Sequence, residues 1–250
     1  VGHLTSIMYD IGVNHHAAFC AAELALLDLA GKTFGVSAGS VIGKIAKRKI
    51  RYSAVIAAKD PEKAGNIARL ARWYCFKQVK VKVGKSLNDN LAIVSRVRHV
   101  MGKKAEIRID ANCAWTGEEA LRQLIQLNRF DINGVEQPVP ADDIDGMKHI
   151  TSSKIAPVIA DESLCGTADA EKLISLKACD IFNIRVSKCG GLLNSVKIYQ
   201  LAENAGLRCQ LGAQVGETAV LSSAGRHIAT RCKNIGWAEG SYGVLLMKAD

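Results

Sequence analysis

The sequence lacks the features that mark several large classes of protein. Its eight cysteines are scattered singly, without a C-x-x-C pair, so neither a zinc cluster nor a redox dithiol is expected. No apolar run approaches the roughly 20 residues that a membrane-spanning helix needs. The chain begins V-G-H-L-T-S-I-M-Y-D, without an initiator Met and without the pattern of a signal peptide. We therefore expect a cytoplasmic protein with no membrane partner, and a fragment of a longer chain.

Aromatic residues are also scarce, at 5% of the chain, and this affects how the net charge of +9 is interpreted. A strongly basic protein can bind nucleic acid. Only residues 44–51, KIAKRKIR, form a dense basic cluster, and no aromatic stacking pattern accompanies it. We therefore expect no nucleic-acid partner, and interpret the positive charge as a solvated surface or as a surface that faces an acidic substrate.

What the sequence does contain is a regular alternation that begins near residue 50. Eight short strand-like runs alternate with seven helix-like stretches, which indicates βαβ units and a parallel sheet of the α/β class. The number of strands favours a TIM-like (β/α)7β barrel over a doubly wound sheet, whose first turn is rich in glycine. The strands are expected at residues 51–58, 78–84, 105–110, 132–137, 156–162, 179–186, 207–213 and 235–240.

The first 49 residues do not follow this alternation. Residues 15–35 predict one helix with a broad apolar face, ended by Gly31 and Gly35, and no clear strand precedes it. The single cysteines fall mostly in apolar stretches, where a free thiol behaves as a small hydrophobic group. We expect reduced thiols in or near the core.

Carboxylates end three consecutive predicted strands. Asp110 ends the third, Glu136 the fourth and Asp161 the fifth. In a parallel barrel these ends meet at one face, where catalytic groups lie. Any one of these acids alone is more simply a helix N-cap or a loop acid. Three like charges side by side need a compensating cation, and oxygen ligands suit Mg²⁺, with Mn²⁺ as an alternative.

Lysines flank the three acids in the sequence. Alternation places Lys80 and Lys82 on the same face of the second strand, and Lys188 follows the sixth. From Lys82 to Lys188 the five charged residues lie 25 to 28 residues apart, about one βα unit each. A lysine beside a cation and partly buried holds its proton weakly and can act as a base. Two such lysines and a metal ion suit proton abstraction next to a carboxylate.

Five segments in this order, KVKVG, IDAN, GVEQP, IADES and SKCGG, resemble the enolase superfamily. The resemblance is to the muconate-lactonizing-enzyme-like subgroup of the mandelate racemase/muconate lactonizing enzyme family, and covers residues 15–247. It implies that Mg²⁺ is bound by Asp110, Glu136 and Asp161, and that Lys82 and Lys188 are the acid–base pair. The resemblance further implies that Lys80 helps to hold the substrate carboxylate, and that Asn112 and Glu162 support the substrate-binding groups from behind. Glu239, which ends the eighth strand, is either a further substrate-binding group or a loop acid.

The resemblance also implies a domain organisation. Residues 1–49 would be the remnant of an N-terminal capping domain, reduced to its terminal helix. Residues 50–250 would be the catalytic barrel, truncated at its C-terminal end. Members of the mandelate-racemase-like subgroup have a catalytic His after strand seven, where this chain reads LGAQVGET.

The favoured function is Mg²⁺-dependent abstraction of the proton alpha to a substrate carboxylate, through an enediolate. Racemisation or epimerisation of an amino-acid derivative or dipeptide suits the paired lysines. Muconate-type cycloisomerisation and o-succinylbenzoate-synthase-like dehydration need the same groups. A Schiff-base aldolase using Lys82 or Lys188 and a non-catalytic or inactive barrel fragment are further alternatives. The expected partners are a small carboxylate substrate and further copies of the chain in a homo-oligomer.

Overall fold

A computed structural model describes residues 15–240 of the chain. Its strands follow chain order in one eight-stranded sheet, and the pairs β1–β2 to β5–β6 and the pair β7–β8 run parallel. The strands are β1 (Ala54–Ile56), β2 (Gln78–Lys82), β3 (Glu106–Asp110), β4 (Ile132–Glu136), β5 (Val158–Ala160), β6 (Ile181–Ile184), β7 (Arg208–Leu211) and β8 (Ile235–Ala238).

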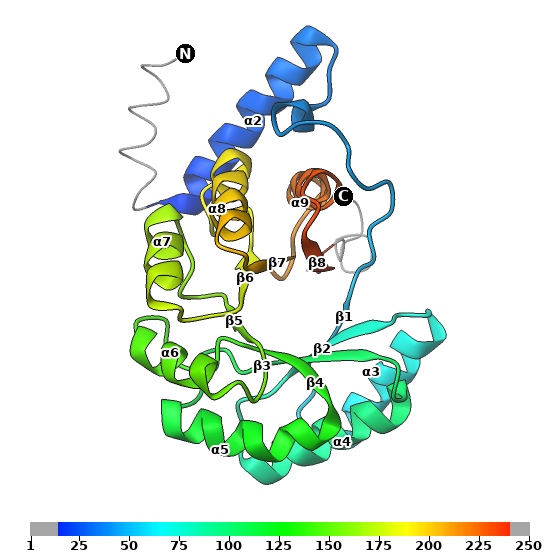
Figure 1. Cartoon of the computed structure of the whole chain (residues 1–250). Coiled ribbons are helices and arrows are strands. Elements are labelled where there is room, and N and C mark those ends of the chain that lie inside the picture. Colours follow the sequence, from blue (N-terminus) through cyan, green and yellow to red (C-terminus); the bar gives the residue numbers. More distant parts are fainter. Residues whose placement is uncertain (1–14, 241–250) are drawn as a thin grey trace. The chain divides into compact units, whose positions relative to one another are not determined.

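One α-helix lies between each strand and the next (Figure 1), so the predicted (β/α)7β topology is confirmed for the described residues. These helices are α3 (Pro61–Trp73), α4 (Leu87–Met101), α5 (Gly117–Leu127), α6 (Ile144–Ser153), α7 (Thr167–Leu176), α8 (Leu192–Asn204) and α9 (Ala219–Arg231). Before β1 come α2 (His16–Phe34) and the 3-10 turn η1 (Ala38–Val41), and a second 3-10 turn, η2 (Asn128–Phe130), precedes β4. None of the helices between residues 15 and 240 is long and apolar enough to cross a membrane.

The N-terminal helix differs from its prediction at one point. It continues through Gly31 and ends at Phe34, with Gly35 in the left-handed conformation at φ +65°. Position 31 requires a glycine, because the Cβ of any other residue would lie only 2.8 Å from the backbone oxygen of Val36. Residues 1–14 and 241–250, which include the start of the predicted capping remnant and the predicted truncated end of the barrel, lie outside the described residues.

The chain divides into two compact units, which are described separately. Among the described residues, the first consists of residues 15–51, 164–171 and 183–240, and the second of residues 52–163 and 172–182. Residues 15–49 therefore belong to the same unit as β7, α8, α9 and β8.

In the second unit, helices α3 to α6 cover one side of strands β1 to β5 (Figure 1). Each of these helices begins at a polar side chain that accepts a hydrogen bond from a backbone N–H three residues later: Asp60, Ser86, Thr116 and Asp143. Val79 and Val81 of β2 are fully buried, as are Ile107 and Ile109 of β3. Because side chains alternate along a strand, Lys80 and Lys82 lie on the opposite face from these valines.

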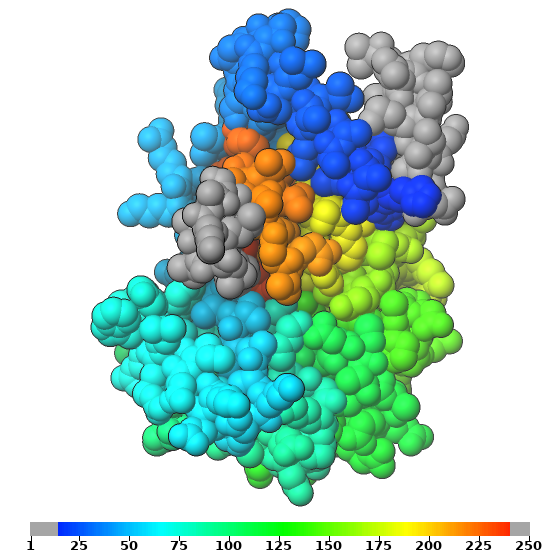
Figure 2. Space-filling view, turned by 180° about the vertical axis from the view of Figure 1, so that it is seen from behind, coloured from blue at the N-terminus to red at the C-terminus, as the bar shows by residue number. Residues whose placement is uncertain are grey.

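In the first unit, α2 packs against α8, and η1 packs against α9. Figure 2 shows the blue atoms of the N-terminal segment directly against yellow and orange atoms of these two helices. The segment that leads to β1 is tied to α9 as well, because the backbone N–H groups of Ala46 and Lys47 both donate to the Thr230 oxygen at 2.8 Å. The N-terminal segment is thus an integral part of this unit.

The cysteines are all free, as predicted. Five are buried: Cys20, Cys179, Cys189, Cys209 and Cys232. Cys113 and Cys165 are partly exposed, and Cys75 is exposed at the end of α3, so the expectation of a core or near-core position is wrong for Cys75.

His227 on α9 contacts the 3-10 turn η1. Arg231 Nη1 lies 3.2 Å from His227 Nδ1, and because a guanidinium only donates, this ring nitrogen accepts. Arg231 Nε also donates to the Gly43 oxygen at 3.1 Å, which links both side chains to the segment after η1. Burial, followed by the positive charges of Arg231 and Arg226, lowers the pKa of His227.

This contact predicts a loss of stability in acid. A histidine whose pKa is lowered on folding stabilises the fold above its ordinary pKa of about 6.5, and this contribution is lost as the pH falls toward the folded value. Gln in place of His227 can still accept from Arg231 but does not titrate. The free energy of unfolding in urea should therefore fall less between about pH 7.5 and about pH 5 in His227→Gln than in the wild type. His149→Gln, at an exposed site on α6, should keep the wild-type slope, and equal slopes for all three proteins would contradict the assignment.

Candidate functional site

An ion network joins the C-terminal ends of β2, β3 and β4. Lys80 Nζ lies 3.3 Å from Asp110 Oδ2 and 3.1 Å from Glu136 Oε1, and all three side chains are buried. Lys82 Nζ donates to Asp110 Oδ2 at 2.7 Å, and its side chain is 34% exposed. Strand register explains the convergence, because Lys82 is paired with Asp110 and Asp110 with Glu136. The structure thus brings together four of the predicted site residues.

Asn112 extends this network toward Glu162. Lys82 Nζ donates to Asn112 Oδ1 at 2.6 Å, and Asn112 Nδ2 donates to Glu162 Oε1 at 3.3 Å. Asn112 has φ +46° and the next residue, Cys113, has φ +63°. Two consecutive non-glycine residues in the left-handed region are costly, and such strain is concentrated at functional sites. The backbone after β3 is therefore held in an unusual conformation beside the ion network.

Asp161 follows β5 and is 2% exposed. Its backbone position depends on Gln137, a residue that the sequence did not single out. Gln137 Oε1 accepts hydrogen bonds from the N–H of Asp161 at 3.0 Å, the N–H of Ser163 at 3.2 Å and the Ser163 hydroxyl at 3.0 Å. Gln137 Nε2 donates to the Val139 oxygen at 3.0 Å. One fully buried side chain on the segment after β4 thus fixes the segment that carries Asp161.

Arg108 adds a third cation beside Lys80 and Lys82, and the sequence analysis did not select it. It lies on β3 two residues before Asp110, so both side chains project from the same face of the strand. Its side chain is 1% exposed, and Nη2 donates to Ser53 Oγ at 2.8 Å. The alternation in EIRID could have identified Arg108, because a residue at this position shares the face of Asp110.

The charged side chains at and beside the C-terminal ends of β2 to β5 nearly balance in number. Three cations, Lys80, Lys82 and Arg108, stand against four acids, Asp110, Glu136, Asp161 and Glu162. The lysines therefore provide part of the compensation that the sequence assigned to a metal ion. Burial, followed by the negative charges of Glu162, Asp161 and Asp110, raises the pKa of the Cys113 thiol to about 11. Glu162, Asp161 and Asp110 thus all lie close enough to act on the Cys113 thiol together.

The acid set fits a hard divalent ion by its chemistry. Within residues 15–240 no three acidic, His or Cys side chains are already arranged as a metal-binding cluster. Asp110 and Glu136 instead contact Lys80. Asp110, Glu136 and Asp161 nevertheless offer buried carboxylate oxygens at the ends of three neighbouring strands. Carboxylate oxygens are the ligands that Mg²⁺ and Mn²⁺ prefer in proteins.

Lys188 lies in the first unit, in the turn that follows β6. Its Nζ donates to the Asn183 oxygen at 3.3 Å, so the side chain folds back toward the end of the strand. The turn is closed by backbone hydrogen bonds of 2.8 Å from Cys189 N to the Arg185 oxygen and from Gly191 N to the Val186 oxygen. The Lys188 oxygen lies 2.7 Å from His16 Nδ1.

Polar groups also gather at the ends of β7 and β8. Arg185 Nη1 donates to Gln214 Oε1 at 3.0 Å, and the Gln214 N–H donates to Glu217 Oε1 at 2.8 Å. Burial raises the pKa of Glu217, against this hydrogen bond and the charge of Arg185. Glu239 is 4% exposed, and its N–H donates to the Leu211 oxygen at 2.8 Å. Neither Gln214 nor Glu217 was selected from the sequence, because nothing in LGAQVGET shows that these residues hydrogen-bond to each other and to Arg185.

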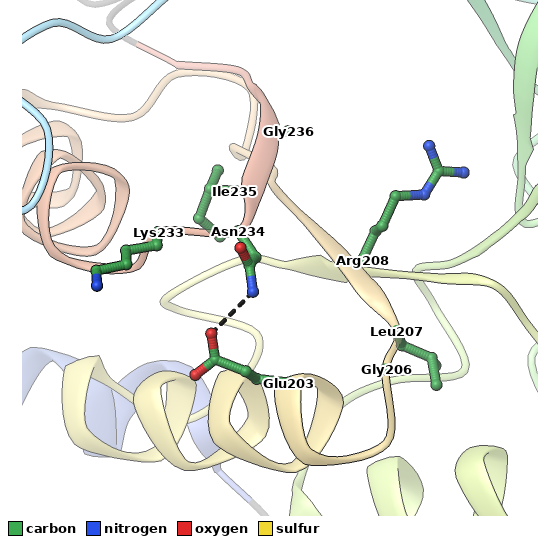
Figure 3. A pocket seen from close by; sticks show the side chains of 8 residues that line it. All are labelled: Glu203, Gly206, Leu207, Arg208, Lys233, Asn234, Ile235 and Gly236. Carbon is green, nitrogen blue, oxygen red and sulfur yellow. Dashed lines mark hydrogen bonds between the residues drawn. The ribbon is translucent and has the colours of Figure 1, made fainter.

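A pocket of about 350 Å³ lies at the opposite ends of these strands (Figure 3). It is formed where β7 and β8 begin, and Asn234 donates to Glu203 across it at 2.8 Å. Its lining residues are Glu203, Gly206, Leu207, Arg208, Lys233, Asn234, Ile235 and Gly236. None of the predicted site residues is among them, and the N-terminal ends of barrel strands serve stability more than catalysis. We therefore place the candidate site at the C-terminal strand ends.

The role of Gln137 is tested by Gln137→Leu. This change removes one acceptor from three donors around Asp161 and Ser163, and each buried donor left unpaired costs about 1–3 kcal/mol. We expect the free energy of unfolding to fall by about 2–5 kcal/mol, and hydrogen exchange of the amides at residues 161–163 to accelerate. Gln126→Leu, at an exposed position on α5, should change stability by no more than about 0.5 kcal/mol. Equal effects of the two changes would show that Gln137 has no special role.

Comparison with known proteins finds sequences that are similar to this chain. The family described as "Enolase C-terminal domain-like" matches residues 63–250. The N-succinyl-L-Arg/Lys racemase of Bacillus cereus is 35% identical over 213 residues, which are 85% of this chain and 58% of the relative. The L-Ala-D/L-Glu epimerase of Clostridium acetobutylicum is 34% identical over 87% of this chain and 61% of its own length. The chain therefore spans about three fifths of the length of these relatives.

Solved structures show the same fold. The dipeptide epimerase of Enterococcus faecalis V583, in complex with Mg and the dipeptide L-Leu-L-Tyr, aligns with a TM-score of 0.90 and 30% identity. The alignment covers 95% of this chain and 67% of that chain. The resemblance found in the sequence and the TIM-like fold class are thereby confirmed. The chain belongs to the enolase C-terminal domain-like family of the enolase superfamily.

Proposed function

We propose that this protein is a Mg²⁺-dependent isomerase that removes the proton alpha to a substrate carboxylate. The observation that carries the proposal is the ion network of Lys80, Lys82, Asp110 and Glu136 at the strand ends. It combines a partly exposed lysine with carboxylates that can hold a hard cation. Within this chemistry we propose a racemase or epimerase of an amino-acid derivative or dipeptide, because relatives with 34–35% identity are named for such reactions.

The two lysines Lys82 and Lys188 are proposed as the acid–base pair. One removes the alpha proton from a substrate of one configuration, and the other returns a proton to the carbon, which inverts it. Lys82 is 34% exposed and its ammonium is oriented by Asp110 and Asn112, so it is both accessible and positioned. Lys80 is buried between two carboxylates, which suits a positioning and charge-balancing role beside the substrate carboxylate better than proton transfer.

The remaining polar groups are proposed to hold the metal ion and the substrate. Asp110, Glu136 and Asp161 would be the ligands of Mg²⁺, with Mn²⁺ as the alternative ion. When bound, the ion supplies positive charge that stabilises the anion formed from the substrate carboxylate. Asn112 and Glu162 would orient Lys82, and Glu239 would help to position the substrate.

The domain organisation also enters as a proposal. Residues 1–49 are proposed to be the remnant of a capping domain and residues 50–250 the catalytic barrel. The homo-oligomer and the cytoplasmic location stay predictions.

The acid–base pair is tested by exchange of the substrate alpha proton with deuterium in D₂O containing Mg²⁺. The substrates are L-Ala-L-Glu, L-Leu-L-Tyr and N-succinyl-L-Arg, with the alpha-carbon epimer of each. Lys82→Ala and Lys188→Ala should each reduce exchange by about 10²-fold or more for one configuration only, the two variants affecting opposite configurations. Lys148→Ala, an exposed lysine on α6, should match the wild type. Normal exchange of both configurations in both variants would contradict the lysine roles, and no exchange by the wild type with any substrate would contradict the proposed reaction.

The metal ligands are tested by calorimetric titration of Mg²⁺ into the protein. Asp161→Asn removes one anionic ligand and should weaken binding by at least about tenfold, equivalent to about 1.4 kcal/mol. The matched change Asp142→Asn, at an exposed position before α6, should leave the affinity unchanged. Circular dichroism of both variants controls for folding. Unchanged affinity in a folded Asp161→Asn protein would remove Asp161 from the ligand set.

A further inference from the structure

Helix α2 contacts the turn that carries Lys188 through its first residue, His16. The Lys188 oxygen lies 2.7 Å from His16 Nδ1. Because a carbonyl oxygen only accepts, this ring nitrogen carries a hydrogen and donates it. The ring also lies near Gly190 of the turn, since a Cβ added to Gly190 would be 3.9 Å from His16 Cγ. The two residues are 172 positions apart in the sequence, so the turn is held by a helix that is not its neighbour in the chain.

The same helix contacts the segment after the turn through Glu23. The carboxylate accepts hydrogen bonds from the N–H of Leu192 and, at 3.3 Å, from the N–H of Leu193. These are the first two N–H groups of α8, whose N-cap is Gly191 and has no side-chain cap of its own. Seven residues separate His16 from Glu23, which places both on one face of α2. Glu23 is 8% exposed, so this contact is part of the packed interior.

The segment held between these two contacts is rich in glycine. Gly190 and Gly191 have φ of +75° and +105°, and a side chain on Gly191 would collide with the Glu23 carboxylate. Two consecutive glycines give a segment little intrinsic preference for one conformation. The position of the backbone at Lys188 therefore depends on the bonds that close the turn and on the two contacts from α2.

We propose that His16 and Glu23 are positioning residues for Lys188, and we call this pair the α2 clamp. The proposal rests on the proposed role of Lys188 in proton transfer. A base must lie within hydrogen-bond reach of the proton that it removes, and a misplacement of about 1 Å can cost about 10²-fold in rate. His16 fixes the carbonyl of Lys188 itself, and Glu23 fixes the start of α8 just beyond the turn. Helix α2 thus belongs to the proton-transfer machinery as well as to the packing of its unit.

The proposal is tested with four variants of the 250-residue chain. His16→Ala removes the donor to the Lys188 oxygen, and His16→Asn restores one, because the Asn amide nitrogen can occupy a position close to that of Nδ1. His15→Ala removes an exposed imidazole one residue away that makes no capping bond. Glu23→Gln keeps a single acceptor for the two N–H groups of α8 and leaves the His16 contact intact.

The first measurement is alpha-proton exchange in D₂O from each configuration of a substrate that the wild type accepts. We expect His16→Ala to reduce kcat by about 10- to 100-fold for the configuration that also fails in Lys188→Ala, and by less than about 3-fold for the other. KM should stay within about 2-fold, His16→Asn should recover most of the lost rate, and His15→Ala should match the wild type. An equal loss for both configurations, or no loss for either, would overturn the proposal while leaving the proposed function intact.

The second measurement does not require activity. Hydrogen–deuterium exchange of backbone amides at residues 188–193 should be at least about 10-fold faster in His16→Ala than in the wild type. It should return toward the wild-type rate in His16→Asn, and in Glu23→Gln the increase should be confined to residues 191–193. If the wild type exchanges no substrate proton, the proposed function fails, and the exchange of these amides still decides whether the clamp holds the turn. Unchanged amide exchange in both His16→Ala and Glu23→Gln would overturn the clamp.

Discussion

The candidate site depends on one buried ammonium group. Lys80 Nζ is shared between Asp110 and Glu136, at 3.3 and 3.1 Å, on three neighbouring strands. Two buried carboxylates this close would repel strongly without a cation between them. Removal of one partner from a buried ion pair typically costs about 3–5 kcal/mol, because the other charge is left uncompensated. Lys80 therefore stabilises the strand ends in addition to any role toward substrate, and a loss of activity on its substitution would not separate the two roles.

The charge balance around Lys80 suggests why a cation and an anionic substrate would bind together. The three cations and four acids of this region leave an excess of one negative charge. A divalent ion would convert this excess into one positive charge, which a substrate carboxylate would neutralise. Each ligand would then favour the other through charge alone, and Arg108 and Gln137, both fully or almost fully buried, would keep the surrounding backbone fixed.

The sequence predicted the parts of the site that follow from local periodicity. Alternation in KVKVG placed Lys80 and Lys82 on one face, and the repeat of βα units placed Asp110 and Glu136 at equivalent strand ends. Gln137 and His16 could not be found in this way, because their roles are defined by hydrogen bonds to residues 24 and 172 positions away. The position of Gly31 inside α2 could not be predicted from local patterns either, since it depends on close contact with Val36 and not on helix propensity.

The central proposal is that Asp110, Glu136 and Asp161 bind one metal ion, for which Asp110 and Glu136 would give up contacts with Lys80. A crystal structure of the chain grown with MgCl₂ tests it most directly. We predict one ion at about 2.0–2.1 Å from oxygen atoms of Asp110, Glu136 and Asp161, with Lys80 Nζ displaced from at least one of its carboxylate partners. An ion bound elsewhere, with Lys80 and Lys82 still paired as they are now, would contradict the account.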